Sequence, residues 1–125
     1  MKKYTQADFD NFEVDKFGRK ICPAGDYTTI KDFVEYCVFG GHCRFGDGCY
    51  FGDGCNFGAY CYFGSGCDFG KECRFGGLCG FGEGGNFGVG CSFGEWCTFG
   101  ECCTFGEGCN YENGAVKQWS LCRRG

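Results

Sequence analysis

Proline, histidine and methionine are nearly missing from this sequence, with one residue of each in the chain. Because a fifth of the residues are aromatic, the low proline content argues against a disordered chain. A single histidine leaves His42 as the one candidate for a catalytic imidazole. No apolar run approaches the roughly 18 residues of a membrane-spanning helix, and the opening MKKYTQADFD lacks the apolar stretch of a secretory signal.

Positive charge is also scarce, since 12 Lys and Arg residues face 16 Asp and Glu residues and the formal charge is −4. A negative balance disfavours surfaces that bind nucleic acid or anionic membranes directly. We therefore expect neither nucleic acid nor a membrane among the direct partners, and a protein partner instead.

Glycine, phenylalanine and cysteine are abundant, with 26, 16 and 15 residues, which indicates a repeat. Thirteen consecutive hexads run from Cys37 to Gly114. Cys opens twelve of these hexads and Gly85 opens the other. Phe holds the third place until Tyr111 replaces it in the last hexad, and Gly holds the fourth place in all but the last.

The first and third places of each hexad lie two residues apart, so they share one face of a strand. Cys and Phe are therefore expected to point inward, and the residue between them outward. The remaining Gly-x-x is expected to turn, because Gly permits positive φ where the chain bends. Short strands and short turns that alternate without long loops must coil.

The hexads resemble the hexapeptide repeat of left-handed parallel β-helix proteins. That family places a bulky aliphatic residue inward with a small residue two places before it, and here Phe39, Phe45 and their successors take the bulky place. Phe in place of an aliphatic residue is the departure. The resemblance implies an all-β, left-handed parallel β-helix with three hexads per coil. Residues 25–114 would then form about five coils.

The two ends depart from the repeat. Residues 1–24 are expected to cap the coil, because Thr5 to Asp8 fits a capping box and predicts a short helix with Phe9 and Phe12 on its apolar side. Two short strands are expected around Gly18. Residues 115–125 are expected to form a C-terminal cap and tail, with Trp119 and Leu121 as a plug.

The cysteines are regular in spacing and odd in number, which favours reduced thiols in the cytoplasm of a bacterial host. A line of thiols along a wall is not the tetrahedral cage of a zinc site, so we expect no metal and no other cofactor. The regular cysteines are predicted to be small buried residues. Cys22, Cys102 and Cys122 fall outside the inward place and are predicted to be exposed, reactive thiols.

If three hexads make one coil, residues eighteen apart stack at one corner. One corner is then apolar and mostly aromatic, with His42, Tyr60, Leu78 and Trp96. The other two lean acidic, with Asp47, Ser65, Glu83 and Glu101 at one and Asp53, Lys71, Val89 and Glu107 at the other. We predict an interface at the first corner and an acidic surface formed by Asp47, Asp53, Glu83, Glu101 and Glu107. The interface has three candidate occupants: the N-terminal helix through Phe9 and Phe12, a second copy, or a foreign protein.

Many proteins of the resembling family are acyltransferases that use a histidine beside an extruded loop. No insertion interrupts the hexads between residues 37 and 114, so we expect no enzyme and no catalytic residue. An acyltransferase-like enzyme is kept only as a distant alternative, behind two other hypotheses. In the first, a narrow acidic rod imitates duplex nucleic acid and blocks a nucleic-acid-handling enzyme, as a phage or mobile-element inhibitor such as an anti-CRISPR protein would. In the second, the chain is a structural rod that self-associates.

Overall fold

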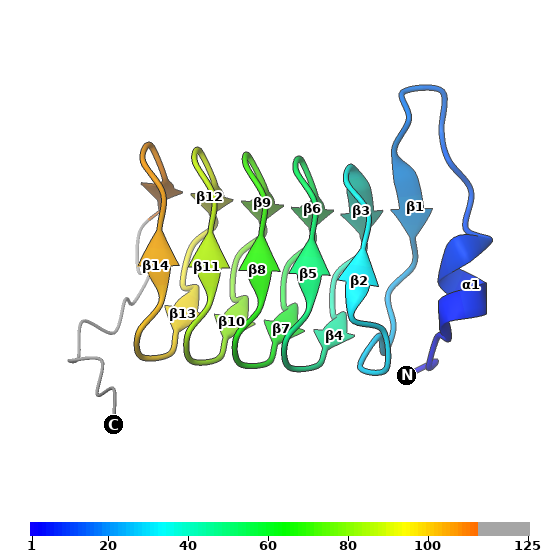
Figure 1. Cartoon of the computed structure of the whole chain (residues 1–125), viewed down its shortest axis with the longest axis horizontal. Coiled ribbons are helices and arrows are strands. Elements are labelled where there is room, and N and C mark those ends of the chain that lie inside the picture. The colour runs from blue at the N-terminus through cyan, green and yellow to red at the C-terminus, as the bar shows by residue number, and fades with distance from the viewer. Residues whose placement is uncertain (113–125) are drawn as a thin grey trace.

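The computed structural model describes residues 1–112, and these form a parallel β-solenoid of about five turns (Figure 1). Successive coils lie side by side along the long axis of the molecule. This confirms the all-β coil expected from the hexads. The expected C-terminal plug with Trp119 and Leu121 lies outside the described residues.

Three parallel sheets form the walls of the solenoid. The β3 wall contains β1 (Lys20–Cys22), β3 (Cys37–Phe39), β6 (Asn56–Phe57), β9 (Arg74–Phe75), β12 (Ser92–Phe93) and β15 (Asn110–Tyr111). The β4 wall contains β4 (Arg44–Phe45), β7 (Tyr62–Phe63), β10 (Gly80–Phe81) and β13 (Thr98–Phe99). The β2 wall contains β2 (Asp32–Phe33), β5 (Tyr50–Phe51), β8 (Asp68–Phe69), β11 (Asn86–Phe87) and β14 (Thr104–Phe105). Phe45 pairs with Phe63 and Phe63 with Phe81, so each coil contains eighteen residues, or three hexads.

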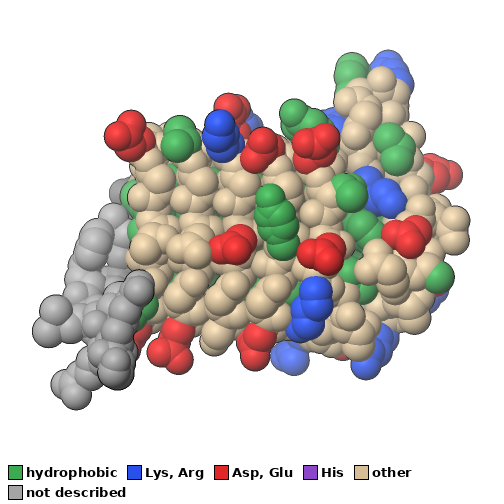
Figure 2. Space-filling view, viewed as in Figure 1, with side chains coloured by type: hydrophobic (Ala, Val, Ile, Leu, Met, Phe, Trp, Pro, Cys, Tyr) green, Lys and Arg blue, Asp and Glu red, His purple; other side chains and the backbone are tan. Residues whose placement is uncertain are grey.

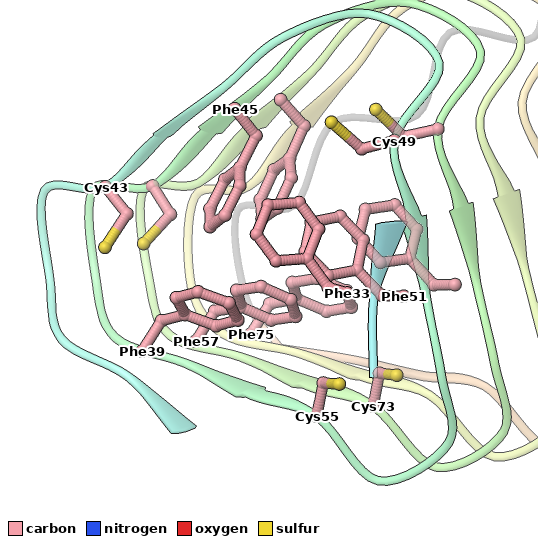
Figure 3. Close-up of a cluster of buried hydrophobic side chains, with 14 of the residues drawn as sticks. Phe33, Phe39, Cys43, Phe45, Cys49, Phe51, Cys55, Phe57, Cys73 and Phe75 are labelled. Atoms are coloured by element: carbon pink, nitrogen blue, oxygen red, sulfur yellow. The ribbon is translucent and has the colours of Figure 1, made fainter. Parts of the chain in front are cut away.

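The phenylalanines of the third place fill the interior as columns of rings (Figure 3). Within one wall the rings stack, as Phe45 and Phe63 do with centroids 4.8 Å apart and planes 4° apart. Rings of neighbouring walls meet edge to face, as Phe45 and Phe51 do at 5.1 Å and 86°. Each buried phenylalanine contributes about 1.5–3 kcal/mol. The ring columns therefore supply most of the apolar burial that stabilises the rod.

The regular cysteines lie at the inner corners, and those from Cys37 to Cys97 are almost completely buried. Their thiols also donate hydrogen bonds. The Sγ of Cys79 lies 3.4 Å from the carbonyl oxygen of Gly58, and the Sγ of Cys97 lies 3.4 Å from that of Gly76. Each acceptor is the fourth-place glycine of the preceding coil. Cysteine thus fills a small inward place and supplies a donor to a partly buried carbonyl of the preceding coil.

The glycines of the turns differ from the sequence expectation. Positive φ occurs at the sixth place of the hexad, as at Gly84 (φ 68°), and not at the fourth. The fourth place requires glycine because coils approach closely there. A Cβ on Gly82 would lie 2.8 Å from the carbonyl carbon of Gly64 in the preceding coil. The fourth place of the hexad therefore needs glycine because the backbones of neighbouring coils are in contact there, and not because of a positive φ.

The predicted N-terminal helix is α1 (Gln6–Asp10), which lies at the N-terminal end of the rod (Figure 1). The N–H of Asp8 donates to Thr5 Oγ1 at 3.2 Å, and the N–H of Thr5 donates to Asp8 Oδ2 at 2.8 Å. These bonds lower the pKa of Asp8. Phe9 is buried, with its ring 5.1 Å from that of Phe33, so α1 covers the first layer of rings. Among the described residues, no helix has the length and apolar character needed to cross a bilayer.

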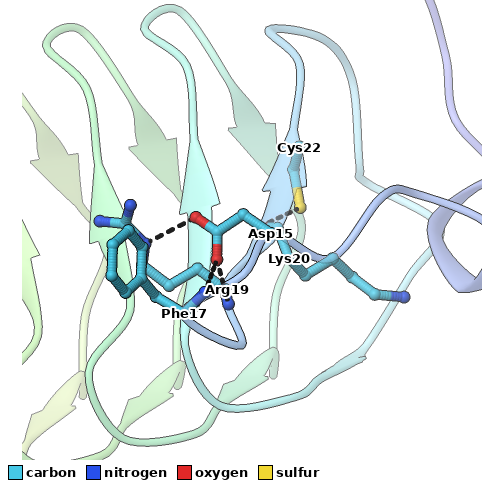
Figure 4. Close-up of polar contacts among 5 residues, drawn as sticks. All are labelled: Asp15, Phe17, Arg19, Lys20 and Cys22. Carbon is cyan, nitrogen blue, oxygen red and sulfur yellow. Dashed lines mark hydrogen bonds and ion pairs between the residues drawn. The ribbon is translucent and has the colours of Figure 1, made fainter.

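A hairpin around Gly18 (φ 82°) links α1 to the solenoid, with an antiparallel bridge between Val14 and Lys20. The carboxylate of Asp15 accepts hydrogen bonds from the backbone N–H and from Nε of Arg19, both at 2.9 Å (Figure 4). These bonds lower the pKa of Asp15. The two predicted short strands therefore meet in one tight, polar turn.

Two of the three cysteines predicted to be exposed and reactive are not. Cys22 lies in β1, opposite Phe39 of β3, and is only 2% exposed. Its Sγ donates to the carbonyl of Lys20 at 3.6 Å (Figure 4). The prediction was wrong because β1 joins the β3 wall upstream of residue 25. Cys102 is half-buried and disulfide-bonded, so it carries no free thiol, and Cys122 lies outside the described residues.

Candidate interaction surfaces

The residues His42, Tyr60, Leu78 and Trp96 stack on consecutive coils at the corner between the β3 and β4 walls, and we call them the aromatic ridge. All four side chains are exposed, and Trp96 is 58% exposed. The His42 and Tyr60 rings stack with centroids 4.9 Å apart. The ridge is thus a continuous apolar and aromatic line on the surface.

The ridge residues have an unfavourable backbone conformation. Their φ angles lie between 59° and 63°, in the left-handed region. That region costs about 1–2 kcal/mol for each residue other than glycine. At the same place on the next corner the chain has Gly48, Gly66 and Gly84, followed by Cys102, and the third corner has Tyr36 and Glu72 beside its glycines. Glycine is therefore the residue that adopts this backbone conformation without strain. Backbone strain of this kind tends to persist where a side chain serves a function.

The chain's own N-terminal helix does not occupy the ridge. Phe9 packs on Phe33, and the ring of Phe12 meets that of Tyr4 at 5.2 Å. Both contacts lie at the end of the rod, and the ridge stays exposed. Of the three candidate occupants, a second copy and a foreign protein remain.

The acidic residues of the other two corners flank one wall. Asp47, Glu83 and Glu101 lie at the corner between the β4 and β2 walls, and Asp53 and Glu107 lie at the corner between the β2 and β3 walls. All five side chains are exposed. Figure 2 shows this face, with Asp and Glu side chains along both of its long edges and also between them.

Two carboxylates between the edges were missed by the sequence reasoning. Asp32 and Asp68 project outward from β2 and β8, and both are exposed. Asp68 Oδ1 accepts a hydrogen bond from Nδ2 of Asn86 in the next coil, at 2.8 Å. Sorting the outward strand residues by the period of eighteen, as was done for the turns, would have found them. We call the β2 wall with its two acidic edges the acidic face.

Hydrogen bonds from the next coil orient two of the edge carboxylates. Asp47 Oδ1 accepts the N–H of Ser65 at 2.8 Å, and Asp53 Oδ1 accepts the N–H of Lys71 at 2.8 Å. The two bonds are equivalent, one on each edge of the face. They fix the orientation of the two carboxylates. The edges also carry cations, because Lys71 follows Asp53 on the next coil and Lys31 Nζ donates to the carbonyl oxygen of Asp47 at 2.7 Å.

The charges of the acidic face are not compensated by ion pairs. Within residues 1–112 the one ion pair joins Asp15 and Arg19, in the N-terminal hairpin. From Phe75 to Glu112 the sequence has five Glu residues and no Lys or Arg. The negative potential is therefore greatest over the C-terminal half of the described rod.

The aromatic ridge and the acidic face lie on opposite sides of the triangular coil. The ridge corner joins the β3 and β4 walls and does not border the β2 wall. A single flat partner surface therefore cannot contact both. The two predicted surfaces are two separate sites.

Hydrogen bonds between the buried thiols of successive coils shift the pKa values of these thiols in both directions. A hydrogen bond with the thiol of the preceding coil, together with burial, raises the pKa of Cys55 and of Cys73 to about 12. The same kind of bond lowers the pKa of Cys61 and of Cys97. Metal ligation and nucleophilic attack need an accessible thiolate, and both of these side chains are fully buried. Within the described part of the chain, no group of three or more His, Cys, Asp or Glu residues is arranged to hold a metal ion.

Comparisons with protein-family models, with curated proteins and with solved structures found no match to this chain. The function must therefore be argued from the two surfaces.

Proposed function

We propose that this protein is a non-enzymatic inhibitor whose acidic face occupies the cationic nucleic-acid-binding surface of an enzyme. The observation that carries the proposal is the pair of carboxylate rows that flank one wall, with Asp32 and Asp68 between them and no ion pair on any of these residues. A cationic groove that is built for phosphates is complementary to such a face.

The spacing of the rows supports mimicry of duplex nucleic acid. Successive coils are about 4.8 Å apart, and carboxylates occupy three of four coils on one edge and two of four on the other, where Lys71 and Val89 intervene. The phosphates of duplex DNA follow one another at about 3.4 Å along each strand, so the charge density of the face is lower than that of a duplex. Six residues separate the two rows within one coil, which corresponds to roughly 15 Å for a short strand with its turns. Two lines of negative charge at this separation resemble the two backbones that border a groove of about 12 Å.

The family and the setting belong to the same proposal. We take the chain to be a Phe- and Cys-rich variant of the left-handed hexapeptide-repeat proteins, without their acyltransferase chemistry. His42 supports this, because its ring stacks on Tyr60 as a corner residue. Among the described residues every cysteine except the disulfide-bonded Cys102 is a free thiol. This predominance of free thiols favours a reducing compartment, such as the cytoplasm of a bacterial host, where a phage or mobile-element inhibitor of the anti-CRISPR kind would act.

A competition assay tests the proposal. A Cas9-type effector loaded with guide RNA is incubated with labelled target duplex and increasing amounts of the protein, and bound duplex is measured by fluorescence anisotropy. We expect displacement of the duplex that weakens as salt is raised, because the contact is electrostatic. The double variant Glu83→Lys/Glu101→Lys should lose at least tenfold in potency.

The matched control is Asp10→Lys/Glu13→Lys, which changes the net charge equally but lies outside both the acidic face and the aromatic ridge. It should keep most of the potency. Equal potency of the two double variants would show that net charge and not the acidic face is responsible. The assay extends to other bacterial DNA-binding enzymes, and failure to displace duplex from all of them would overturn the proposal.

A further inference from the structure

We propose that the aromatic ridge is the contact between two antiparallel copies of this chain. The ridge side chains are exposed, and their residues keep a left-handed φ although they are not glycine. The helix α1 packs elsewhere, against Phe33. Exposed apolar lines of this kind mark interaction sites. The argument for a second copy as the occupant comes from repeat spacing and charge.

The first argument is the spacing of the ridge. Its side chains follow the coil repeat of about 4.8 Å over four coils. The His42 and Tyr60 rings, 4.9 Å apart, show that the side chains keep this repeat. A second copy carries a ridge with the same repeat, so contacts made at one coil recur along the whole line. An isologous contact of this kind needs only one self-complementary patch.

The second argument is the placement of negative charge. The ridge is the one corner that does not border the β2 wall, so two copies that meet there keep their acidic faces on the outer sides. Contact through either of the other corners would bring two rows of carboxylates together. Opposed like charges disfavour that contact. Of the three corners, the ridge is thus the one at which a second copy meets little repulsion.

Charge also determines the orientation. Glu95 precedes Trp96 at the C-terminal end of the ridge, and Arg44 follows His42 by two residues at the other end; both charged side chains are exposed. Parallel copies would place Glu95 beside Glu95. Antiparallel copies place Glu95 near the end that carries Arg44 in the second copy, which is favourable.

A dimer of this kind would carry two acidic faces that point in opposite directions. Bivalent inhibition would follow, and that consequence rests on the proposed function. The dimer itself does not, because it can be measured without any enzyme. Failure of the competition assay and failure of dimerisation are therefore separate results.

Sedimentation velocity of the full chain over a wide range of concentrations tests the proposal. The ridge spans four coils, which is smaller than a standard interface, so we expect a weak dimer with a Kd of about 10–100 µM. The variant Tyr60→Ser/Trp96→Ser should raise the Kd at least tenfold. Its matched control is Tyr36→Ser, because Tyr36 is also exposed and also has positive φ (58°) but lies at another corner.

Three outcomes overturn the proposal: a wild type that stays monomeric at about 500 µM, well above that Kd, a ridge variant that dimerises like wild type, or a Tyr36→Ser variant that loses dimerisation equally. The orientation has its own test. Glu95→Lys and Arg44→Glu should each raise the Kd several-fold, and the two combined should restore it. Glu95→Gln separates the two orientations, because it removes a repulsion between paired Glu95 side chains in parallel copies and an attraction to Arg44 in antiparallel ones. Tighter dimerisation of Glu95→Gln would indicate parallel copies and overturn the antiparallel arrangement.

Discussion

The interior of this solenoid repeats on all three walls, whereas its outer corners differ from one another. Inside, ring stacks such as Phe63 on Phe81, with centroids 4.8 Å apart, recur on every wall. Outside, the sixth place of the hexad carries four bulky side chains at the ridge corner and, at the next, Gly48, Gly66 and Gly84 followed by Cys102. The difference indicates that the repeated interior residues stabilise the fold, and that the candidate binding residues lie at the corners where the sequence varies.

The corners can vary because the fold requires little of them. A residue at the sixth place needs only a positive φ, which glycine adopts without cost. The fold therefore tolerates Leu78 and Trp96 at this place but does not require their side chains. The four predictions below separate interior from corner, beginning with the interior.

The largest effect should come from alkaline pH. Burial and hydrogen bonding to neighbouring thiols raise the pKa of Cys55 and Cys73 to about 12, and the pKa values of Cys37 and Cys91 are raised as well. An unfolded thiol has a pKa of about 8.5. These raised pKa values therefore contribute stability that is fully present below pH 8.5 or so and is lost as pH rises toward the folded pKa. Each such thiol should therefore lower the free energy of unfolding by about 1.4 kcal/mol for each pH unit above about 8.5.

Urea denaturation under reducing conditions at pH 7, 8.5 and 9.5 measures this loss. The ridge should contribute nothing to it, so Tyr60→Ser/Trp96→Ser should show the same dependence on pH. A denaturation midpoint that stays constant up to pH 10 or so would mean that the thiols ionise in the folded state and are not enclosed.

The second effect concerns the fourth-place glycines, which belong to the interior although they lie at the corners. A Cβ on Gly76, Gly82 or Gly88 would lie within 2.6–2.8 Å of backbone atoms of the preceding coil. Each change to alanine should therefore lower the free energy of unfolding by about 3 kcal/mol, because backbone cannot yield as a side chain can. The three sites represent the three corners, so chemical denaturation should give similar losses. If only one of the three variants lost stability, close approach of the coils would not be a general property of the fourth place, and the contrast between a uniform interior and variable corners would be wrong.

The third effect is smaller and changes sign between corners. Leu78→Gly should raise the free energy of unfolding by about 1 kcal/mol, since it relieves a left-handed residue with φ 59°. Gly84→Ala should lower it by about 1 kcal/mol, because nothing lies within 4 Å of the added Cβ and the cost is the conformation alone. Thermal denaturation of both variants is sufficient. If Leu78→Gly is destabilising, the ridge stabilises the coil and its strain does not point to binding.

The repeat made the interior predictable from sequence, because each hexad assigns its own inward and outward places. The same reasoning missed what depends on non-repeating segments. Cys22 is buried because β1 pairs with β3, and Phe9 meets Phe33 because α1 lies on the end of the rod. Neither contact has a period to reveal it. The site of positive φ was also missed, since the hexad alone does not show that coils touch at the fourth place and turn at the sixth.

The smallest effect tests the one gap in the interior. Gly85 opens a hexad where every other has Cys, between Cys67 and Cys103 of the neighbouring coils. A Cβ there would lie 3.4 Å from the Phe87 ring and 3.6 Å from Cys103 Sγ, which are ordinary contacts. Gly85→Ala should therefore raise the free energy of unfolding by about 0.5–1 kcal/mol, because alanine has less conformational entropy to lose. Gly85→Cys should add to that gain if the thiol reaches a corner carbonyl as its neighbours do. If denaturation shows either variant to be less stable than wild type, the wall cannot accommodate a side chain at position 85. The interior would then be less regular than the hexad repeat suggests.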